Sequence, residues 1–434
     1  MQSRSQIERR PSRPAASISH ATVRREVAAA ALMLAIAAGG AAVPADAQER
    51  LSLAGTVRRA VQSNLDLKRQ RLDIPIAQAE VITAGLRPNP QISVNADLLS
   101  SRLPVFTPEQ KQYGLSLAVP LELGGKRDAR ITSARSAVAL TQAQIAESER
   151  QTMLAAANAW FDVAQAKQTL ANIERAKMLF DSVVAINTIR LRDQAITPLE
   201  LRRSQIAADQ YALLAHNASI DVAHSRRALT LLLGASEPVD TDESVPFTFA
   251  PPSLDSTIAH ARAARSDVQA AKVSIEAADA NRQLQDAIAV PDITVSADYL
   301  RQQGTPFYGL SMSVPLPFFS HNQGGIEKAE AEHAQAEYAF DAAVRQAEAE
   351  VRSAYEEYRA RIAMVERYTP MLAESETVLT TVQYAYRTGN TTILDLLDAQ
   401  RTWFELRQAY DDAVIAAQRS AATLAITSGM FPDA

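Results

Sequence analysis

The chain has 434 residues and no cysteine, and its 44 basic and 49 acidic residues give a formal net charge of −5. The lack of cysteine excludes disulfide and thiolate chemistry. An acidic chain without basic clusters matches nucleic acid poorly, so no nucleic-acid partner is expected. The length is enough for two or more domains.

Residues 1–47 have the pattern of an export signal peptide. Arginines, among them Arg24 and Arg25, precede the apolar run VAAAALMLAIAAGGAAV, and the small-residue sequence ADA ends at residue 47. No later stretch approaches the roughly 18 apolar residues that a membrane-spanning helix needs. Any insertion into a membrane is therefore expected to use β-strands.

The rest of the sequence is a duplication, because segments recur in the same order at a shift of roughly 195 to 200 residues. PQISVNADLL recurs as PDITVSADYL, and AITPLELRRSQ recurs as NTTILDLLDAQ. We therefore divide the chain into a first structural repeat at 48–235, a turn-rich linker at 236–253 and a second repeat at 254–434.

Each repeat contains two segments in which apolar and polar residues alternate, as in a β-strand with one apolar and one polar face. The strands are predicted at about 90–99, 112–120, 291–300 and 308–316. Each has about nine residues, which fits a tilted membrane-spanning strand, although hairpins packed on a soluble core would alternate in the same way. Asp97 and Asp298 fall on the polar face, which would line a water-filled lumen.

Long alanine-rich segments predict helices around these strands. The two longest run at 126–192 and at 326–388, where Pro370 predicts a kink. Shorter helices are predicted before the strands at about 52–84 and 253–288, and after the long helices at about 198–233 and 393–428. An ordinary helical bundle or a solvated coiled coil would have similar helices, but neither explains strand hairpins at matching positions.

Four strands cannot close a membrane barrel, because the smallest such barrels have about 8 strands and an open edge in lipid is forbidden. Two copies would supply eight strands and three copies twelve, and only the larger barrel leaves a useful channel. The pattern therefore favours a trimer of a mixed α/β membrane protein that is mainly α-helical.

The ends of the long helices carry helix caps. Thr197 and Glu200 have the spacing of a capping box, and Thr392 and Asp395 occupy the same positions in the second repeat. Capping does not explain Asp398, which lies one turn further on the same helix face.

Asp395 and Asp398 could be a catalytic pair, a metal site, a cap or part of a ring of charge. Nothing nearby would separate their pKa values, and no cluster of ligands offers a metal cage. No enzyme active site, metal site or cofactor is therefore predicted.

With its paired strand hairpins between long alanine-rich helices, the sequence resembles the TolC-like outer membrane efflux proteins. The stretches LRPNPQISVNADL, VPLELGGKRDAR and VPLPFFSHNQGGIEKAEAE look like the branch that serves heavy-metal efflux of the cobalt-zinc-cadmium type. The resemblance implies a homotrimer with a twelve-stranded β-barrel in the outer membrane and an α-helical tunnel in the periplasm. It also implies a periplasmic adaptor protein and a proton-driven inner membrane pump of the resistance-nodulation-division (RND) class.

The resemblance also implies a role for the helix ends. In that family, two aspartates at this spacing line the narrow periplasmic entrance, so Asp395 and Asp398 are expected to form a cation-selective ring. Crowding of the carboxylates should raise some of their pKa values. Tyr386 matches a tyrosine of the lock that closes the entrance in the family.

Two other positions of that lock differ here, because Thr391 and Pro198 replace its arginine and aspartate. Different contacts are therefore expected at the tips, from a set of four charged residues: Arg192, Asp193, Arg203 and Arg387.

Other classes of function stay open at this point. A duct for drug efflux or type I protein secretion would have the same sequence features, because the pump selects the cargo. A periplasmic helical adaptor or scaffold would stay outside the membrane, but such proteins usually carry a single helical hairpin.

Overall fold

The computed structural model describes residues 50–97, 112–242, 247–302 and 304–432, and the predicted export signal lies outside them. The first half contains α2 (Leu53–Ser63), α3 (Leu65–Arg71), α4 (Asp73–Ala84), β2 (Gln91–Asp97), β3 (Gln112–Leu121), α5 (Lys126–Arg192) and α6 (Pro198–Leu232). The second half contains α7 (Leu254–Ala264), α8 (Ser266–Ile288), β5 (Ile293–Gln302), β6 (Thr305–Ser313), α9 (Gln323–Arg387) and α10 (Ile393–Thr427). The two halves therefore share one order of long elements, as the duplicated sequence predicts.

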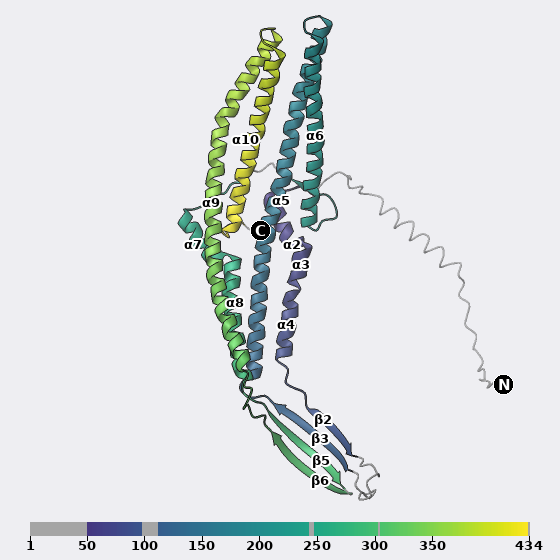
Figure 1. The fold of residues 1–434 in the computed structure, drawn as a ribbon, viewed down its shortest axis with the longest axis vertical. Helices are drawn as coiled ribbons and strands as arrows, with labels where there is room; N and C mark the ends of the chain where they lie inside the picture. Colours follow the sequence, from purple (N-terminus) through teal and green to yellow (C-terminus); the bar gives the residue numbers. More distant parts are fainter. Residues whose placement is uncertain (1–49, 98–111, 243–246, 303, 433–434) are drawn as a thin grey trace, which may run out of the picture. The chain divides into compact units, whose positions relative to one another are not determined.

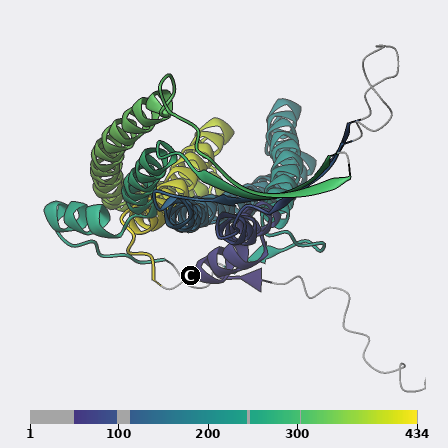
Figure 2. The same ribbon diagram turned by 90° about the horizontal axis from the view of Figure 1, so that it is seen from below.

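The four long strands form one antiparallel sheet in the order β2-β3-β5-β6. In its register Ser116 lies opposite Asp298, and Ala297 lies opposite Leu310. This register puts the polar residues of all four strands on one face and the apolar residues on the other. Seen from below in Figure 2, the sheet is curved.

The helices that adjoin the sheet repeat the order of the strands. α4 leads into β2, β3 into α5, α8 into β5 and β6 into α9. α4 packs on α5, α5 on α8, and α8 on α9, so the helix row α4-α5-α8-α9 continues the strand row (Figure 1). The helix at each end of the helix row adjoins the strand at the same end of the sheet: α4 adjoins β2, and α9 adjoins β6.

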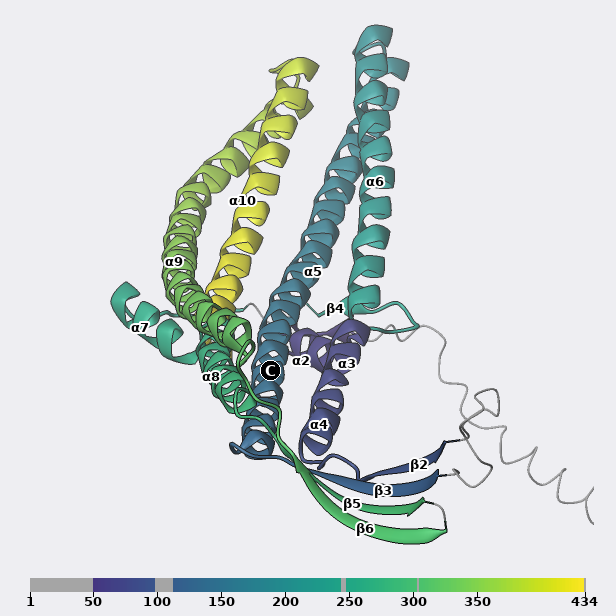
Figure 3. The same cartoon turned by 60° about the horizontal axis from the view of Figure 1, so that its bottom comes forward.

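Away from the sheet, the long helices form two helical hairpins. α6 turns back along α5, α10 turns back along α9, and α10 also packs on α5 (Figures 1 and 3). α5 has the bounds expected from its uninterrupted run of good helix formers. α9 continues through Pro370 without a break and is drawn as a curved helix in Figure 3. A local kink at this proline stays a prediction.

The two shorter helices expected before the strands are each broken. In the first half, Asn64 separates α2 from α3, accepting a hydrogen bond from the N–H of Leu67 and donating one to the carbonyl of Leu232 at 2.9 Å. In the second half, Arg265 separates α7 from α8 and donates to the carbonyl of Thr427 at 3.4 Å. Both breaks therefore dock a short helix onto the C-terminal end of α6 or α10.

The largest hydrophobic cluster lies where α2, α5, α6 and α10 meet. Trp160 and Phe161 of α5 are 3% and 1% exposed there, and Leu229 and Ile426 pack in the same cluster. The Trp160 indole N–H donates to the carbonyl of Leu51 at 2.9 Å. Leu51 belongs to β1 (Arg50–Leu51), which pairs in parallel with β4 (Asp240–Thr241), a contact that the sequence analysis did not predict.

Candidate functional site

Capping boxes start the second helix of both hairpins. The Thr392 hydroxyl accepts from the N–H of Asp395 at 3.2 Å, and the Asp395 carboxylate accepts from the N–H of Thr392 at 3.0 Å. Thr197 and Glu200 make the same reciprocal bonds at the start of α6, where Pro198 occupies the first turn. The predicted caps are therefore present, and they satisfy backbone N–H groups that the helices leave unpaired.

Asp395 is an exposed carboxylate, and one of its oxygens, Oδ2, is bonded within its own tip. It also accepts hydrogen bonds from the hydroxyls of Thr392 at 2.6 Å and Thr391 at 2.8 Å. These bonds, that of Thr392 first, hold the pKa of Asp395 below its ordinary value. The rise in pKa expected from crowded carboxylates concerns several copies of the chain and stays a prediction.

Asp398 lies one turn later and has a different environment. It is exposed, and no residue in the described ranges donates a hydrogen bond to its carboxylate. Asp395 and Asp398 share a groove of about 360 Å³ with Ser375 and Val378 of α9 and Thr402 of α10. The carboxylate of Asp398 can therefore meet a mobile cation without first breaking a hydrogen bond. Arg401, one turn further along α10, is near enough to interact with it electrostatically.

Tyr386 joins the two hairpins near their tips. Its side chain is 5% exposed, and its hydroxyl donates to Oδ1 of Asn187 on α5 at 2.6 Å. The Arg190 guanidinium lies 4.8 Å from the centre of the tyrosine ring and donates to the Tyr386 carbonyl at 3.2 Å. Burial raises the pKa of Tyr386, so the hydroxyl keeps its proton and stays a donor.

An apolar cluster of Val183, Tyr386, Ile393 and Leu396 surrounds this contact. Sequence reasoning missed Asn187 and Arg190, although their spacing from Val183 on α5 puts all three on one helix face. This spacing is the sequence signal from which their position on one face of α5 could have been predicted.

The four charged residues expected at the tips are exposed: Arg192, Asp193, Arg203 and Arg387. Among the residues that the structure describes, their side chains have neither hydrogen-bond nor ion-pair partners. Their part in contacts between copies of the chain stays a prediction. Within one protomer, the contact that joins the hairpins near their tips is that of Tyr386 instead.

The polar face of the sheet is centred on Asp298. Its carboxylate accepts hydrogen bonds from the hydroxyl of Ser116 at 2.5 Å and from that of Ser311 at 3.1 Å. The backbone of Asp97 pairs with Gln112, and its side chain lies outside the described part of the structure. The position of these two aspartates in a lumen stays a prediction.

The opposite face of the sheet consists of exposed apolar side chains. Those exposed by at least two thirds are Ile92 (71%), Val94 (75%), Tyr308 (83%), Leu310 (86%) and Met312 (69%). A surface of this kind usually marks a contact with a partner or a membrane. Among the described helices, none is long and apolar enough to cross a bilayer.

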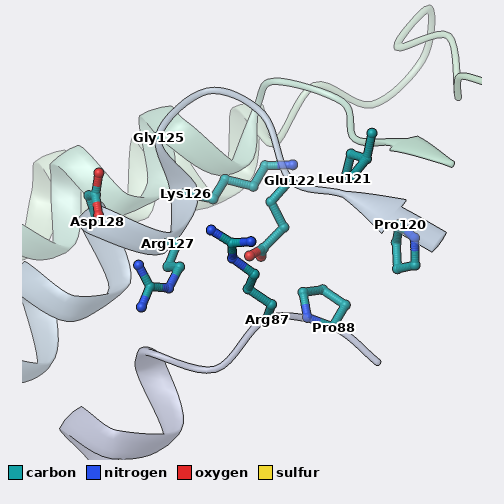
Figure 4. A pocket seen from close by; sticks show the side chains of 9 residues that line it. All are labelled: Arg87, Pro88, Pro120, Leu121, Glu122, Gly125, Lys126, Arg127 and Asp128. Atoms are coloured by element: carbon teal, nitrogen blue, oxygen red, sulfur yellow. The ribbon is translucent and has the colours of Figure 1, made fainter. Parts of the chain in front are cut away.

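Ion pairs and hydrogen bonds join the sheet to the helices at the start of α5. The Lys126 ammonium lies 2.7 Å from the Asp292 carboxylate, and Arg130 pairs with Glu122. Arg127 donates to the carbonyl of Gly85 at 2.7 Å, beyond the end of α4. Glu122, Lys126 and Arg127 also line a pocket of about 300 Å³ (Figure 4).

Within the described ranges, no group of three or more histidine, aspartate and glutamate side chains is arranged to hold a metal ion. The exposed apolar face and the paired aspartates at the tips are therefore the features from which a function can be argued.

Comparisons with known proteins agree on one family. A model of the outer membrane efflux protein family matches residues 56–235 and 257–429, one segment in each half. The cobalt-zinc-cadmium resistance protein CzcC of Cupriavidus metallidurans is 24% identical over 381 residues, which cover 85% of this chain and 87% of that protein. The probable outer membrane lipoprotein SilC of Salmonella typhimurium is 22% identical, with 83% and 82% covered.

Solved structures give the same result for the fold. CusC matches with a TM-score of 0.74 at 18% identity, covering 88% of this chain and 92% of that one. The outer membrane protein VceC of Vibrio cholerae matches with a TM-score of 0.71 at 20% identity, covering 87% and 96%. Together with the family match over most of the sequence, these findings show that the chain belongs to the outer membrane efflux protein family.

Proposed function

We propose that three copies of this chain form the outer membrane channel of a tripartite efflux system that exports heavy-metal cations. A periplasmic adaptor protein and an inner membrane pump of the RND class are its partners, and the pump selects the cargo. The chain itself is a duct and catalyses no reaction.

The observation that carries this proposal is the open row of strands and helices. β2 and β6 are the edge strands of a four-stranded sheet whose apolar face is exposed. In lipid an unpaired edge costs several kcal/mol for each backbone group, so β6 of one copy must pair with β2 of another. Three copies then close a twelve-stranded barrel, which is wide enough for a channel, and its outer surface is the apolar face.

The helix row supports the same closure. Because α4 and α9 stand at the two ends of the row, the pairing that joins β6 to β2 also brings α9 of one copy beside α4 of another. The helices then form a tunnel that continues the barrel. The polar face around Asp298, whose carboxylate accepts hydrogen bonds from Ser116 and Ser311, then turns toward water inside the barrel.

We place the narrow entrance of this tunnel at the hairpin tips. Three copies bring three pairs of Asp395 and Asp398 around one axis, and converging carboxylates attract cations and repel anions. A cationic cargo agrees with the name of one relative, the cobalt-zinc-cadmium resistance protein CzcC.

Ion conduction through planar bilayers tests the proposal. We expect the purified chain to form a small cation-selective channel, and Asp398→Asn to reduce the preference for cations over anions. Asp398 is the better target because its carboxylate caps no helix, whereas replacing Asp395 would also remove a cap.

Asp209→Asn is the matched control, because it removes one exposed carboxylate from α6 outside the tip. Folded protein that forms no channel would contradict the proposed duct. A channel that responds equally to Asp398→Asn and Asp209→Asn would leave the duct but remove the charged entrance.

A further inference from the structure

The segment between β6 and α9 extends the apolar face of the sheet beyond the sheet itself. β6 ends at Ser313, but the alternation of its apolar row continues through Val314, Leu316 and Phe318. Leu316 is 67% exposed, Phe318 78% and Phe319 94%. The polar residues of the helix start follow from His321 onward, so the change from apolar to polar surface is abrupt.

Hydrogen bonds hold this segment against the helices while both phenyl rings stay free. The Asn322 side chain donates to the Gln285 carbonyl of α8 at 2.8 Å. The Gln323 side chain donates to the Phe319 carbonyl at 3.2 Å and accepts from the N–H of His321 at 2.9 Å. These bonds tie the segment to the start of α9 and to α8, and none of them involves the two rings.

Three backbone positions of this segment have no free donor. Pro315 and Pro317 have no N–H, and the N–H of Phe318 donates to the Leu316 carbonyl at 2.9 Å. Unpaired donors are what makes irregular backbone costly beside lipid. At these three positions the segment therefore avoids that cost where it leaves the sheet at a membrane surface.

The other connections at this end of the sheet are exposed but aliphatic. Leu86 precedes β2, Leu121 and Leu123 lie at the end of β3, and Val290 precedes β5. The aromatic pair is thus a feature of the second repeat, where the segment before α9 is longer than its counterpart before α5.

We propose that Phe318 and Phe319 form an anchor in the membrane interface, with both rings among the phospholipid headgroups at the helix end of the sheet. Phe318 lies four residues beyond Val314, at most about 14 Å along the chain, so its ring can reach the headgroup layer next to a membrane-spanning sheet. Apolar and aromatic side chains of interfacial segments enter this boundary by roughly 5 to 10 Å.

A neighbouring copy of the chain does not compete for the position of Phe318. It extends the sheet in its own plane, at the edge of β6, whereas the apolar row that ends in Phe318 points out of that plane. Phe319 follows this row outside the strand, and it is placed beside Phe318 by its adjacency and its 94% exposure. The inference rests on the proposed function, because a sheet outside the membrane would leave the rings in water. Its consequence is that the loop, and not the strands alone, sets the depth of the sheet.

Tryptophan fluorescence in lipid vesicles tests the anchor. Phe319→Trp places a reporter at the proposed depth, and Phe318→Trp gives a second reading if the first variant does not fold. Tyr338→Trp is the control, since Tyr338 is 78% exposed on α9 but lies about 22 Å beyond the start of that helix. The native Trp160 and Trp403 give the same background in all variants.

We expect phospholipids brominated near the headgroup to quench most of the fluorescence added by Phe319→Trp, and to leave Tyr338→Trp unchanged. Quenching of Phe319→Trp by aqueous iodide alone would put the ring in water, and quenching by neither would bury it against protein. Both outcomes overturn the anchor.

Conductance of the same samples separates the two proposals. Protein that conducts without being quenched by brominated lipid overturns the anchor alone. Protein that neither conducts nor enters the bilayer overturns the duct as well.

Discussion

The contact between Tyr386 and Asn187 gives a sharp prediction for the closed state of the tips. Tyr386→Phe removes the hydroxyl that donates to Asn187 Oδ1 at 2.6 Å, and Asn187 is 0% exposed. The amide nitrogen of Asn187 has no partner in the described structure, so the variant would leave this buried amide without any hydrogen bond from its side chain.

The cost of this change can be estimated from the structure. A buried polar group that loses its partner costs about 1 to 3 kcal/mol, and about 1.4 kcal/mol corresponds to a tenfold change in an equilibrium. If opening separates α9 from α5 at this point, the contact is already absent in the open state. The cost then falls on the closed state alone, and each copy shifts toward opening by about 5- to 150-fold.

Single-channel recording measures this shift. We expect Tyr386→Phe to raise the open fraction or the conductance, and Tyr386→Phe with Asn187→Leu to return it toward wild type, because the unpaired amide is gone. Tyr384→Phe is the matched control, since Tyr384 is 71% exposed on the same helix. Equal conductance of Tyr386→Phe and Tyr384→Phe would refute the idea that this contact holds the tips closed.

Two further predictions concern stability. Arg265→Met should lower the free energy of unfolding by about 3 kcal/mol, because the fully buried guanidinium pairs with Asp267 at 2.6 Å and with Glu350 at 2.7 Å. Arg262→Met is the control: its ion pair with Glu348 is exposed, so its loss should cost less than about 1 kcal/mol. Thermal or denaturant unfolding compares them, and equal losses would contradict the role of burial. Burial alone would raise the pKa of Asp240, but the hydrogen bond from the N–H of Thr241 and the charges of Lys167 and Arg226 outweigh burial and lower that pKa. The free energy of unfolding should therefore fall as the pH drops below about 4, where the carboxylate takes up a proton, and it should fall less steeply in Asp240→Asn. Parallel pH profiles of the two proteins would contradict this assignment.

Periodicity and composition were enough to predict most of the fold. Strand alternation and uninterrupted helix formers are local patterns, and α5 begins and ends where its composition changes. The breaks at Asn64 and Arg265 were missed for a physical reason. Each depends on a hydrogen bond to the end of a helix 168 or 162 residues away, which no local pattern reports.

At the tips, too, the local contacts could be predicted from the sequence and the long-range contact could not. The capping boxes could be predicted because their partners lie three residues apart. The partner of Tyr386 could not, because Asn187 lies 199 residues away and belongs to the other repeat. Charged residues were expected in this role, but the contact observed in one protomer is a neutral hydrogen bond inside an apolar cluster.

Comparison of the two repeats suggests why the second one carries the features of function. Both tips need a cap, and both have one, so Thr197 with Glu200 and Thr392 with Asp395 are explained by stability alone. One turn further, the first repeat has Arg203 where the second has Asp398. Neither side chain has a hydrogen-bond or ion-pair partner in the described structure, so no such contact within one protomer explains the choice of charge. A residue that differs between equivalent positions of the two repeats, with no contact in the protomer to explain the difference, is the best candidate for selection by function. Asp398 is such a residue.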